Sequence, residues 1–387
     1  MGLSVLLLSR YECIGPSSRV RHYNYLPSLK RAGIDVTVAP QLDNDYLRRR
    51  FADKPRNSLA MLKAYGRRLR QILTARQYDL VWIEKEALPW MPANLERIFI
   101  GNRPIIIDFD DAWYLRYSQH RNPLVRYFLG DKFEQLLGNA AMITTGSARL
   151  TKWAEALATE HVVQIPSTVD TDKYSVRPLP EQPFTIGWIG TPSNVRYLTM
   201  ISEALHHVQR VHGARVRLIG AADAKLPGVE VEFIPWHEDV EAEKLGDCHV
   251  GIAPLANGPW EQGKCGYKVI QYMAAGRPVV ASPVGENRHI IVPGETGFFA
   301  NGTEEWISAL TCLAVERERN QRMGFAARKR AEEMYSLRDH SVTIANMIKA
   351  VCSNLELKRE VHKNGASVLD ETFSQEVAYS SQLTAEV

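Results

Sequence analysis

Cysteine is scarce and scattered in this sequence of 387 residues. Its five cysteines are odd in number and include no Cys-x-x-Cys pair. This usage argues against a disulfide framework and against a structural zinc site. It is typical of a protein from a reducing compartment.

Long apolar runs are also missing. The first run, Leu3 to Leu8, is stopped by Arg10 and lacks the basic region and the small-residue cleavage site of a signal peptide, so it predicts a buried strand. No later run approaches the roughly 20 residues that cross a bilayer. We therefore expect a cytoplasmic protein that is not integral to a membrane.

Neither sign of charge predominates. The formal net charge is +3, with 24% charged and 45% hydrophobic residues, which is the composition of a soluble globular protein. So small a surplus does not indicate nucleic acid, and no nucleic-acid partner is expected. A chain of this length exceeds one ordinary core and predicts two domains.

Short runs of Val, Ile and Leu alternate with longer amphipathic stretches, a pattern typical of parallel sheets covered by helices on both faces. The strands expected in the first half are residues 3–9, 35–38, 80–83, 105–109, 142–145 and 162–165. Those expected in the second half are residues 185–189, 216–219, 231–234, 250–254 and 279–282. The sequence therefore predicts an α/β fold of two Rossmann-like, doubly wound domains that face each other across a cleft.

A proline-rich connector separates the two halves. It holds Pro178, Pro180 and Pro183, so it can form neither helix interior nor central strand. We expect a first domain over residues 1–180 and a second over residues 181–340. A terminal helix at 341–355 is expected to cross back to the first domain, and a polar tail without periodicity follows at 356–387.

A glycine-bearing loop follows the first expected strand and opens a helix. Gly15 begins this loop, and Arg19 and Arg21 follow it. Free N–H groups at a helix start attract an anion, to which an arginine adds charge. Gly15 and Arg19 are therefore candidate binding residues, and the alternative is an ordinary turn before a helix.

The segment 263–278 is a stronger signal. A loop that carries Lys264 enters a helix at about Gly266, and a buried strand follows the end of that helix. The N–H groups of Gly266 and Tyr267, together with Lys264 and Lys268, would neutralise a diphosphate. The alternative is a helix with solvated lysines.

The second half carries four ordered markers, which are Ile186–Gly190, Val250–Leu255, Met273–Val280 and Pro293–Phe298. On these markers the chain resembles family 4 (group 1) glycosyltransferases, which have the GT-B fold, over residues 1–355. The resemblance implies retaining sugar transfer without a metal or other cofactor. The donor would be a nucleoside-diphosphate sugar held mostly by the second domain, and the acceptor a glycan or a lipid-linked saccharide.

The resemblance also assigns the basic residues. Arg196 falls where the family's phosphate-binding lysine follows the first strand of the second domain. Thr191 stands in place of the family's paired arginine, so one positive charge is missing. Lys264 and Lys268 are expected to supply it.

The family's Glu-x7-Glu pair falls on Gly263 and Gln271 here. Gln271 retains an amide that can bond a ribose hydroxyl. Glu261, two residues before the first position, is expected to reach the sugar and is a candidate catalytic residue.

Three carboxylates, those of Asp108, Asp110 and Asp111, lie at the end of the strand expected at 105–109. Asp110 stands where the family often has a histidine near the sugar. It is the other candidate catalytic residue, able to accept a bond from a sugar hydroxyl, to stabilise positive charge at the anomeric carbon or to take the acceptor's proton. Asp108 is expected to share its face, and Asp111 to point elsewhere. The alternatives are helix capping and an Asp-x-Asp metal site, although no metal is expected.

Ten basic residues lie between Tyr46 and Arg76 against a single acid, Asp53. Leucine and isoleucine residues interleave with them at helical spacing, and such a stretch can rest on an anionic membrane surface. Peripheral contact with the inner membrane face is the resulting hypothesis, and a solvated surface helix is the alternative.

Two other functions suit the same sequence. A GT-B sugar-nucleotide epimerase would use the same cleft without an acceptor. A non-catalytic, donor-binding pseudo-glycosyltransferase would explain the missing glutamate pair. Neither the nucleobase nor the sugar is indicated by the sequence.

Overall fold

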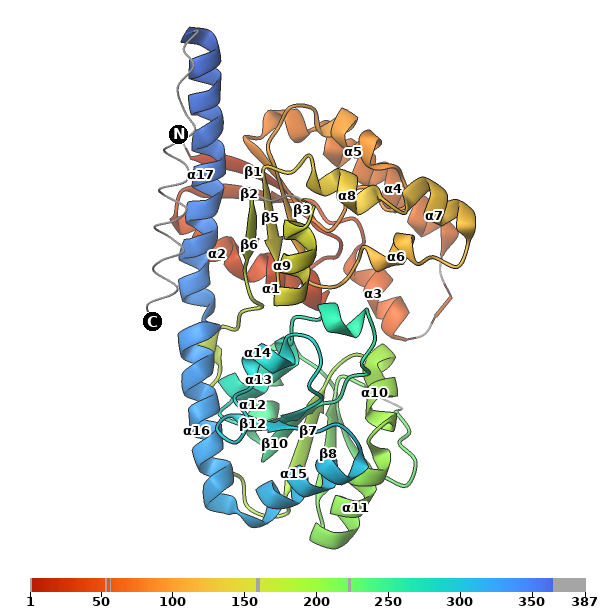
Figure 1. The fold of residues 1–387 in the computed structure, drawn as a ribbon, viewed down its shortest axis with the longest axis vertical. Helices are drawn as coiled ribbons and strands as arrows, with labels where there is room; N and C mark the ends of the chain where they lie inside the picture. The colour runs from red at the N-terminus through yellow and green to blue at the C-terminus, as the bar shows by residue number, and fades with distance from the viewer. Residues whose placement is uncertain (1, 53, 56, 158–160, 222–223, 365–387) are drawn as a thin grey trace.

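The computed structural model describes residues 2–52, 54–55, 57–157, 161–221 and 224–364. Two α/β domains lie one above the other in Figure 1. The first contains a parallel sheet of six strands in the order β2-β1-β3-β4-β5-β6. Its strands are β1 (Leu3–Leu8), β2 (Ile34–Val38), β3 (Leu80–Glu84), β4 (Ile105–Phe109), β5 (Met142–Thr145) and β6 (Val162–Gln164).

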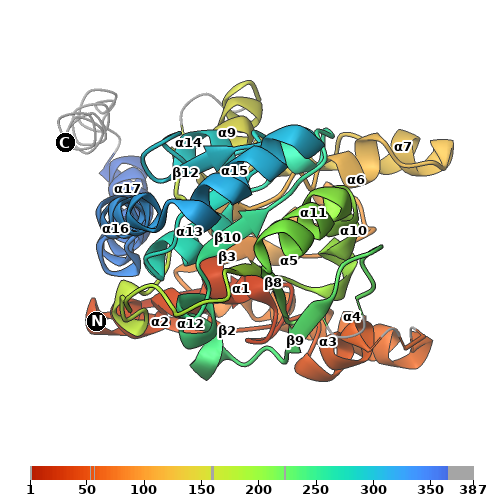
Figure 2. The same cartoon turned by 90° about the horizontal axis from the view of Figure 1, so that it is seen from below.

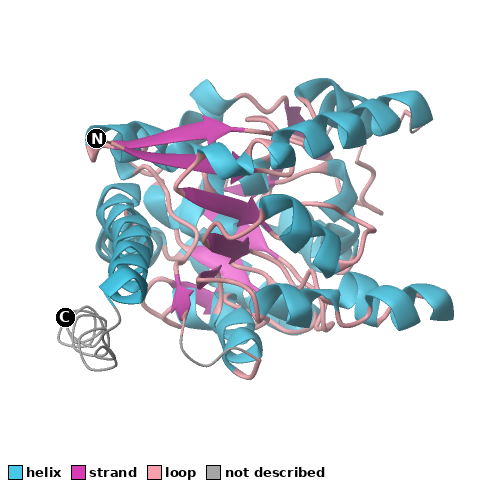
Figure 3. Cartoon of the chain, turned by 90° about the horizontal axis from the view of Figure 1, so that it is seen from above, coloured by secondary structure: helices cyan, strands magenta, loops and turns pink. Residues whose placement is uncertain are grey.

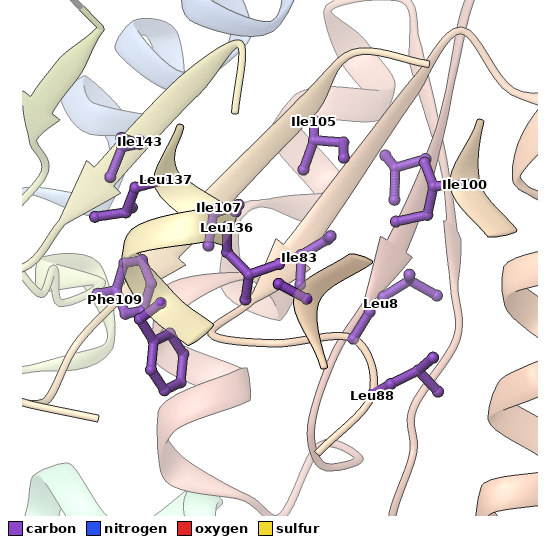
Figure 4. Packing of buried hydrophobic residues seen from close by; sticks show 14 of the residues in the cluster. Leu8, Ile83, Leu88, Ile100, Ile105, Ile107, Phe109, Leu136, Leu137 and Ile143 are labelled. Carbon is purple, nitrogen blue, oxygen red and sulfur yellow. The ribbon is translucent and has the colours of Figure 1, made fainter. Parts of the chain in front are cut away.

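The middle strands of this sheet are apolar because helices bury both of its faces (Figure 3). Figure 4 shows one of these layers, in which Ile83, Ile107 and Phe109 of neighbouring strands pack against Leu136 and Leu137. The helices are α1 (Pro16–Arg21), α2 (Leu26–Arg31), α3 (Asn44–Phe51), α4 (Ser58–Leu73), α5 (Ala93–Ile100), α6 (Leu115–Ser118), α7 (Pro123–Leu129), α8 (Lys132–Leu137) and α9 (Ala148–Glu155).

The second domain repeats the architecture with a six-stranded parallel sheet in the order β12-β11-β10-β7-β8-β9. Its strands are β7 (Thr185–Ile189), β8 (Arg215–Ile219), β9 (Val231–Ile234), β10 (Val250–Ala253), β11 (Val279–Ala281) and β12 (Gly297–Phe299). Its helices are α10 (Val195–Thr199), α11 (Ser202–His212), α12 (Glu238–Gly246), α13 (Tyr267–Ala274), α14 (Asn287–Ile290), α15 (Thr303–Val315) and α16 (Arg317–Met334).

The expected fold class is confirmed. All eleven predicted strands are present, and the predicted boundaries lie within a residue or so of the observed ones. Strand β12 was not predicted. It is an edge strand of three residues, Gly297–Phe299, and the sequence there contains no hydrophobic run long enough to predict a strand.

The chain passes between the domains earlier than the proline-rich connector suggested. Val169 and Tyr174 are buried in the core of the second domain, so residues ahead of position 180 already belong to it. Near Ser336 the chain returns from the second domain to the first, and it does so beside Val169. The Val169 N–H donates to the Tyr335 carbonyl (2.9 Å), and the Leu337 N–H donates to the Val169 carbonyl (3.0 Å).

Helix α17 (Leu337–Asn364) follows this return and runs along the first domain, while α16 lies on the second (Figures 1 and 2). Ile344, Ile348 and Val351 of α17 pack against one face of the first sheet, in a cluster that includes Val5 and Leu7 of β1. The helix extends beyond residue 355, where its end was expected. Of the expected tail, residues 365–387 lie outside the described part of the chain.

No helix in the described ranges combines the length and the apolar character needed to cross a bilayer.

Candidate active site

The segment that joins η5, a 3-10 turn over Glu261–Gly263, to α13 is built around Gly266. This residue has a φ of 67°, in the left-handed region that glycine adopts without strain. A Cβ at this position would also lie 2.3 Å from Cδ1 of Ile290. Glycine is therefore favoured at the position that sets the direction of the N-terminus of α13. The helix begins at Tyr267, directly after Gly266, as predicted.

Two adjoining cavities occupy the cleft between the domains. The first has a volume of about 320 Å³, and its lining includes Ser17, Asp110, Asp111, Lys264, Gly266 and Lys268. The second has a volume of about 480 Å³, and its lining includes Arg19, Trp236, Glu241, Tyr267, Lys268 and Gln271. Both cavities are bordered by Pro16, Thr191, Asn194, Tyr267 and Lys268. An elongated ligand can therefore occupy both at once.

Asp110 faces the first cavity and is held by two groups of its own domain. Lys85 Nζ lies 2.7 Å from its Oδ1, and the Ser17 hydroxyl donates to its Oδ2. Burial would raise the pKa of Asp110, but Lys85 and these hydrogen bonds hold the pKa at about 2. Asp110 is thus a fixed negative charge and a poor proton acceptor.

Lys85 was not identified from the sequence. It follows β3 with a φ of 65°, which is unusual for a residue other than glycine and is typical of functional sites. Its Nζ donates to Ser17 Oγ (2.7 Å) and to Glu84 Oε1 (3.1 Å). Burial lowers its pKa, but Asp110 and Glu84 outweigh that effect and raise it, so the ammonium stays charged. The sequence did hold a signal for Lys85. Three charged residues, Glu84 to Glu86, stand at the end of a buried strand.

Asp108, which was expected to share a face with Asp110, is not among the residues that line the first cavity. Asp108 is buried and accepts hydrogen bonds from Arg21 Nε (3.0 Å), Arg21 Nη2 (2.6 Å) and Thr144 Oγ1 (2.6 Å). This arrangement does not form the Asp-x-Asp metal site considered as an alternative. Across the residues that the structure describes, no group of three or more His, Cys, Asp or Glu residues is arranged to hold a metal ion.

Asp111, which was expected to point elsewhere, lines the first cavity with Asp110. Strand β4 ends at Phe109, so the two-residue alternation of side chains stops before Asp110. The capping alternative is also wrong, because α6 begins at Leu115. Asp111 instead faces the second domain, where its Oδ1 lies 3.6 Å from Lys264 Nζ.

The pKa values of the two lysines of the cleft are shifted in opposite directions. Burial lowers the pKa of Lys264, but Asp111 and the neighbouring Tyr197, Asp110 and Glu261 together raise it above its usual value. Lys268 lies over the Trp188 ring, with Nζ 4.3 Å from the ring centroid. Burial, and then repulsion from Lys264, lower the pKa of Lys268 to about 7. An anion bound here would favour the charged form of Lys268.

Arg196 and Glu261 lie together, beside Tyr197, which lines the first cavity with the two lysines. Arg196 Nη2 donates to Tyr197 Oη (2.7 Å) and to Glu261 Oε1 (3.3 Å), and the Arg196 side chain is 67% exposed. The Tyr197 hydroxyl also donates to Glu261 Oε1 (2.5 Å). The Glu261 carboxylate is therefore hydrogen-bonded to two residues of α10.

A side chain at Gly263, the first position of the Glu-x7-Glu pair, would clash with the first domain in this structure. A Cβ at Gly263 would lie 2.7 Å from the Cβ of Ala112 in the first domain and 2.8 Å from its backbone nitrogen. At the other position, Gln271 lines the second cavity and its Nε2 donates to Tyr174 Oη (3.3 Å). The Tyr174 hydroxyl donates in turn to Glu241 Oε1 (3.0 Å). Glu241, which the sequence did not single out, thus supplies a carboxylate close to Gln271.

The second cavity also joins the two domains. Arg19 of α1 lies over the Trp236 ring, with its Cζ 4.7 Å from the ring centroid. Arg19 is buried, and within the described part of the chain its Nη1 atom has no hydrogen-bond partner. Gly15 is the N-cap residue of α1, where a Cβ would lie 2.5 Å from the Cβ of Tyr11. Glycine at this position therefore lets the loop approach Tyr11, and Gly15 is not among the residues that line either cavity.

Residues 183–315, most of the second domain, match the family described as glycosyl transferases group 1. No curated protein sequence matches the chain. Among solved structures, HepE of Anabaena in complex with UDP-glucose has a TM-score of 0.66 at 16% identity, over 91% of this chain and 100% of that one. Sucrose-phosphate synthase of Thermosynechococcus elongatus has a TM-score of 0.68 at 13% identity, over 92% and 100%.

WaaG, a glycosyltransferase involved in lipopolysaccharide biosynthesis, has a TM-score of 0.64 at 15% identity, over 89% of this chain and 99% of that one. At these identities the structural likeness establishes the GT-B fold. Together with the family match of the second domain, it defines the class of the protein, which is a glycosyltransferase with the GT-B fold.

Proposed function

We propose that the protein transfers a sugar, with retention and without a metal ion, from a nucleoside-diphosphate sugar to a glycan or lipid-linked saccharide acceptor. The observation that carries this proposal is the first cavity, where Lys264, Lys268 and the start of α13 face the fixed charge of Asp110. The lysines and the helix start stabilise a departing diphosphate. Asp110 lies opposite, where it stabilises positive charge at the anomeric carbon.

The second cavity is the proposed nucleoside site. Trp236 offers an aromatic face to a base, and Arg19 offers a buried donor without a partner. Glu241 and Gln271 are placed to bond ribose hydroxyls. Support comes from HepE, a structure of the same fold described in complex with UDP and with UDP-glucose.

The test has two stages. Calorimetric titration with UDP, GDP, ADP and TDP identifies the base, and release of the nucleoside diphosphate from its sugar conjugates is then measured with and without glycan acceptors, in the presence of a chelator. Release that requires an acceptor and survives the chelator supports the proposal. Conversion of the sugar nucleotide without an acceptor would identify an epimerase instead. Binding without turnover would identify a pseudo-glycosyltransferase.

The pKa of Lys268 predicts a pH dependence of donor binding. The pKa is about 7 in the free protein, and a bound diphosphate raises it. Above pH 7 the free side chain loses its proton while the complex keeps it, so the dissociation constant should rise by up to about tenfold per pH unit. Titrations in buffers of different ionisation enthalpy at about pH 8 should show proton uptake, which Lys268→Met abolishes. Equal uptake in that variant would contradict the assignment.

We also propose that α3 and α4 make peripheral contact with an anionic membrane. These helices carry most of the basic stretch, of which residues 53 and 56 lie outside the described ranges. Leu59 and Leu62 of α4 are 60% and 70% exposed. Arg68 does not take part, because it is buried and donates to the carbonyls of Ala39 and Ser9.

Vesicles with anionic lipid should therefore sediment the protein at low salt, and replacing Leu59 and Leu62 by serine should abolish this sedimentation. Neutral vesicles serve as the control. Failure of the unaltered protein to sediment with anionic vesicles at low salt would remove the membrane proposal.

A further inference from the structure

A third cavity lies within the first domain, at the carboxyl edge of its sheet, with a volume of about 300 Å³. Segments that follow β1, β3 and β4 form one side of it, and α3 and α4 form the other. Its lining contains three arginines and five aromatic residues, which are Arg10, Arg50, Arg116, Tyr11, Tyr46, Tyr65, Trp90 and Trp113. None of these side chains has a role in the proposed donor site.

Arginines and tryptophans alternate along one wall. Arg10 Cζ lies 4.6 Å from the ring centroid of Trp113. Arg116 Cζ lies 5.1 Å from the same ring and 4.6 Å from that of Trp90. Guanidinium groups held against aromatic faces are fixed in place and keep their charge.

The wall carries surplus positive charge. The carboxylate that both guanidinium groups approach, that of Glu86, is buried and accepts a hydrogen bond from Lys132 Nζ at 2.7 Å, whereas its contacts with Arg10 and Arg116 are longer, at 3.8 and 3.7 Å. Among the residues described, Nη1 of Arg116 is buried without a hydrogen-bond partner. A buried donor without a partner is costly unless a ligand supplies the acceptor.

Trp90 is held in a strained conformation at the mouth of the cavity. Its φ is 64°, although a bulky residue rarely adopts the left-handed region. Its backbone N–H donates to Tyr117 Oη (2.8 Å), and Trp90 remains 42% exposed. Strain of this kind concentrates at ligand clamps, and an exposed indole is a platform on which a sugar ring can stack.

The cavity adjoins the reaction centre. Trp113 lines it, while Asp110 and Asp111, just before Trp113 in the chain, line the first cavity of the cleft. Lys85, the partner of Asp110, has its Nζ 5.2 Å from the Trp113 ring. A saccharide in this cavity would therefore have the reaction centre beside it.

We propose that this cavity is the acceptor subsite and that it selects a negatively charged saccharide. A sugar ring stacks on Trp90, and its carboxylate or phosphate group pairs with Arg116 and Arg10. This assignment rests on the proposed function, because an acceptor exists only if the protein transfers sugar.

The test uses the full chain with the donor site filled by an excess of the nucleoside diphosphate that binds best. Glucuronate and glucose 6-phosphate are the charged probes, glucose is the neutral one, and binding is followed by ligand-observed NMR. At least one charged probe should bind about tenfold more tightly than glucose, and Arg116→Gln should remove that advantage. Trp90→Ala should weaken all three probes, because stacking does not depend on charge.

Arg48→Gln is the matched control. Arg48 lies on α3, is not among the residues that line the cavity, and pairs with the exposed Asp45, so this variant should bind every probe as the unaltered protein does. Equal binding of charged and neutral probes, or selectivity that persists in Arg116→Gln, would overturn the acceptor assignment. If no nucleoside diphosphate binds to the unaltered protein, it is the proposed function that fails, which distinguishes the two failures.

Discussion

Replacing Asp110 by asparagine is expected to lower kcat about a thousandfold while donor binding changes by no more than about threefold. Asparagine keeps the size of the side chain and a hydrogen-bond acceptor for Ser17, but it removes the negative charge that faces the first cavity. That charge acts on the transition state, in which positive charge develops at the anomeric carbon. Steady-state kinetics and donor titration on the same preparation measure the two quantities.

The partner of Asp110 allows a control for folding. Asp110→Asn leaves the buried ammonium of Lys85 with less compensation, which is expected to cost about 3 kcal/mol of stability. Adding Lys85→Met removes the stranded charge and should return the melting temperature toward that of the unaltered protein. Activity should remain lost. If the double variant regains kcat together with stability, Asp110 serves the fold alone.

Replacing Lys264 by methionine should raise the donor dissociation constant between about tenfold and about a hundredfold, because a charge-assisted hydrogen bond to phosphate contributes roughly 1.5–3 kcal/mol. Methionine keeps most of the aliphatic stem, so the change isolates the ammonium. Lys329→Met is the control, since Lys329 is an exposed lysine of α16 whose partner is Glu333. Unchanged donor binding in Lys264→Met would reject its role at the phosphates.

Most of the fold could be predicted from the sequence because its strands are buried on both faces. A run such as Ile105–Ile107 at the start of β4 is continuously apolar because helices cover both sides of the sheet, and such a run is easily recognised. The position at which the chain crosses between the domains was harder to predict from the sequence. Prolines 178 to 183 mark irregular structure, but Val169 and Tyr174 show which core the preceding segment joins, and that is a property of packing.

The candidate site could be predicted only where one segment creates it. Gly266, Lys264 and Lys268 belong to a single loop and helix, so local rules are enough to bring them together, and all three line the first cavity. Contacts between segments that are far apart in the sequence could not be predicted from it. The pairing of Lys85 with Asp110 requires β3 and β4 to be neighbours, and Glu261 could not be placed without knowing that Tyr197 approaches it.

The break between α16 and α17 lies where the chain returns from the second domain to the first. The outgoing chain at Val169 and the returning chain at Ser336 pair with each other, and α16 is anchored in one core while α17 is anchored in the other. The two covalent connections between the domains therefore lie side by side. We expect any separation of the domains to pivot about these paired segments and to widen the cleft most at the side farthest from them.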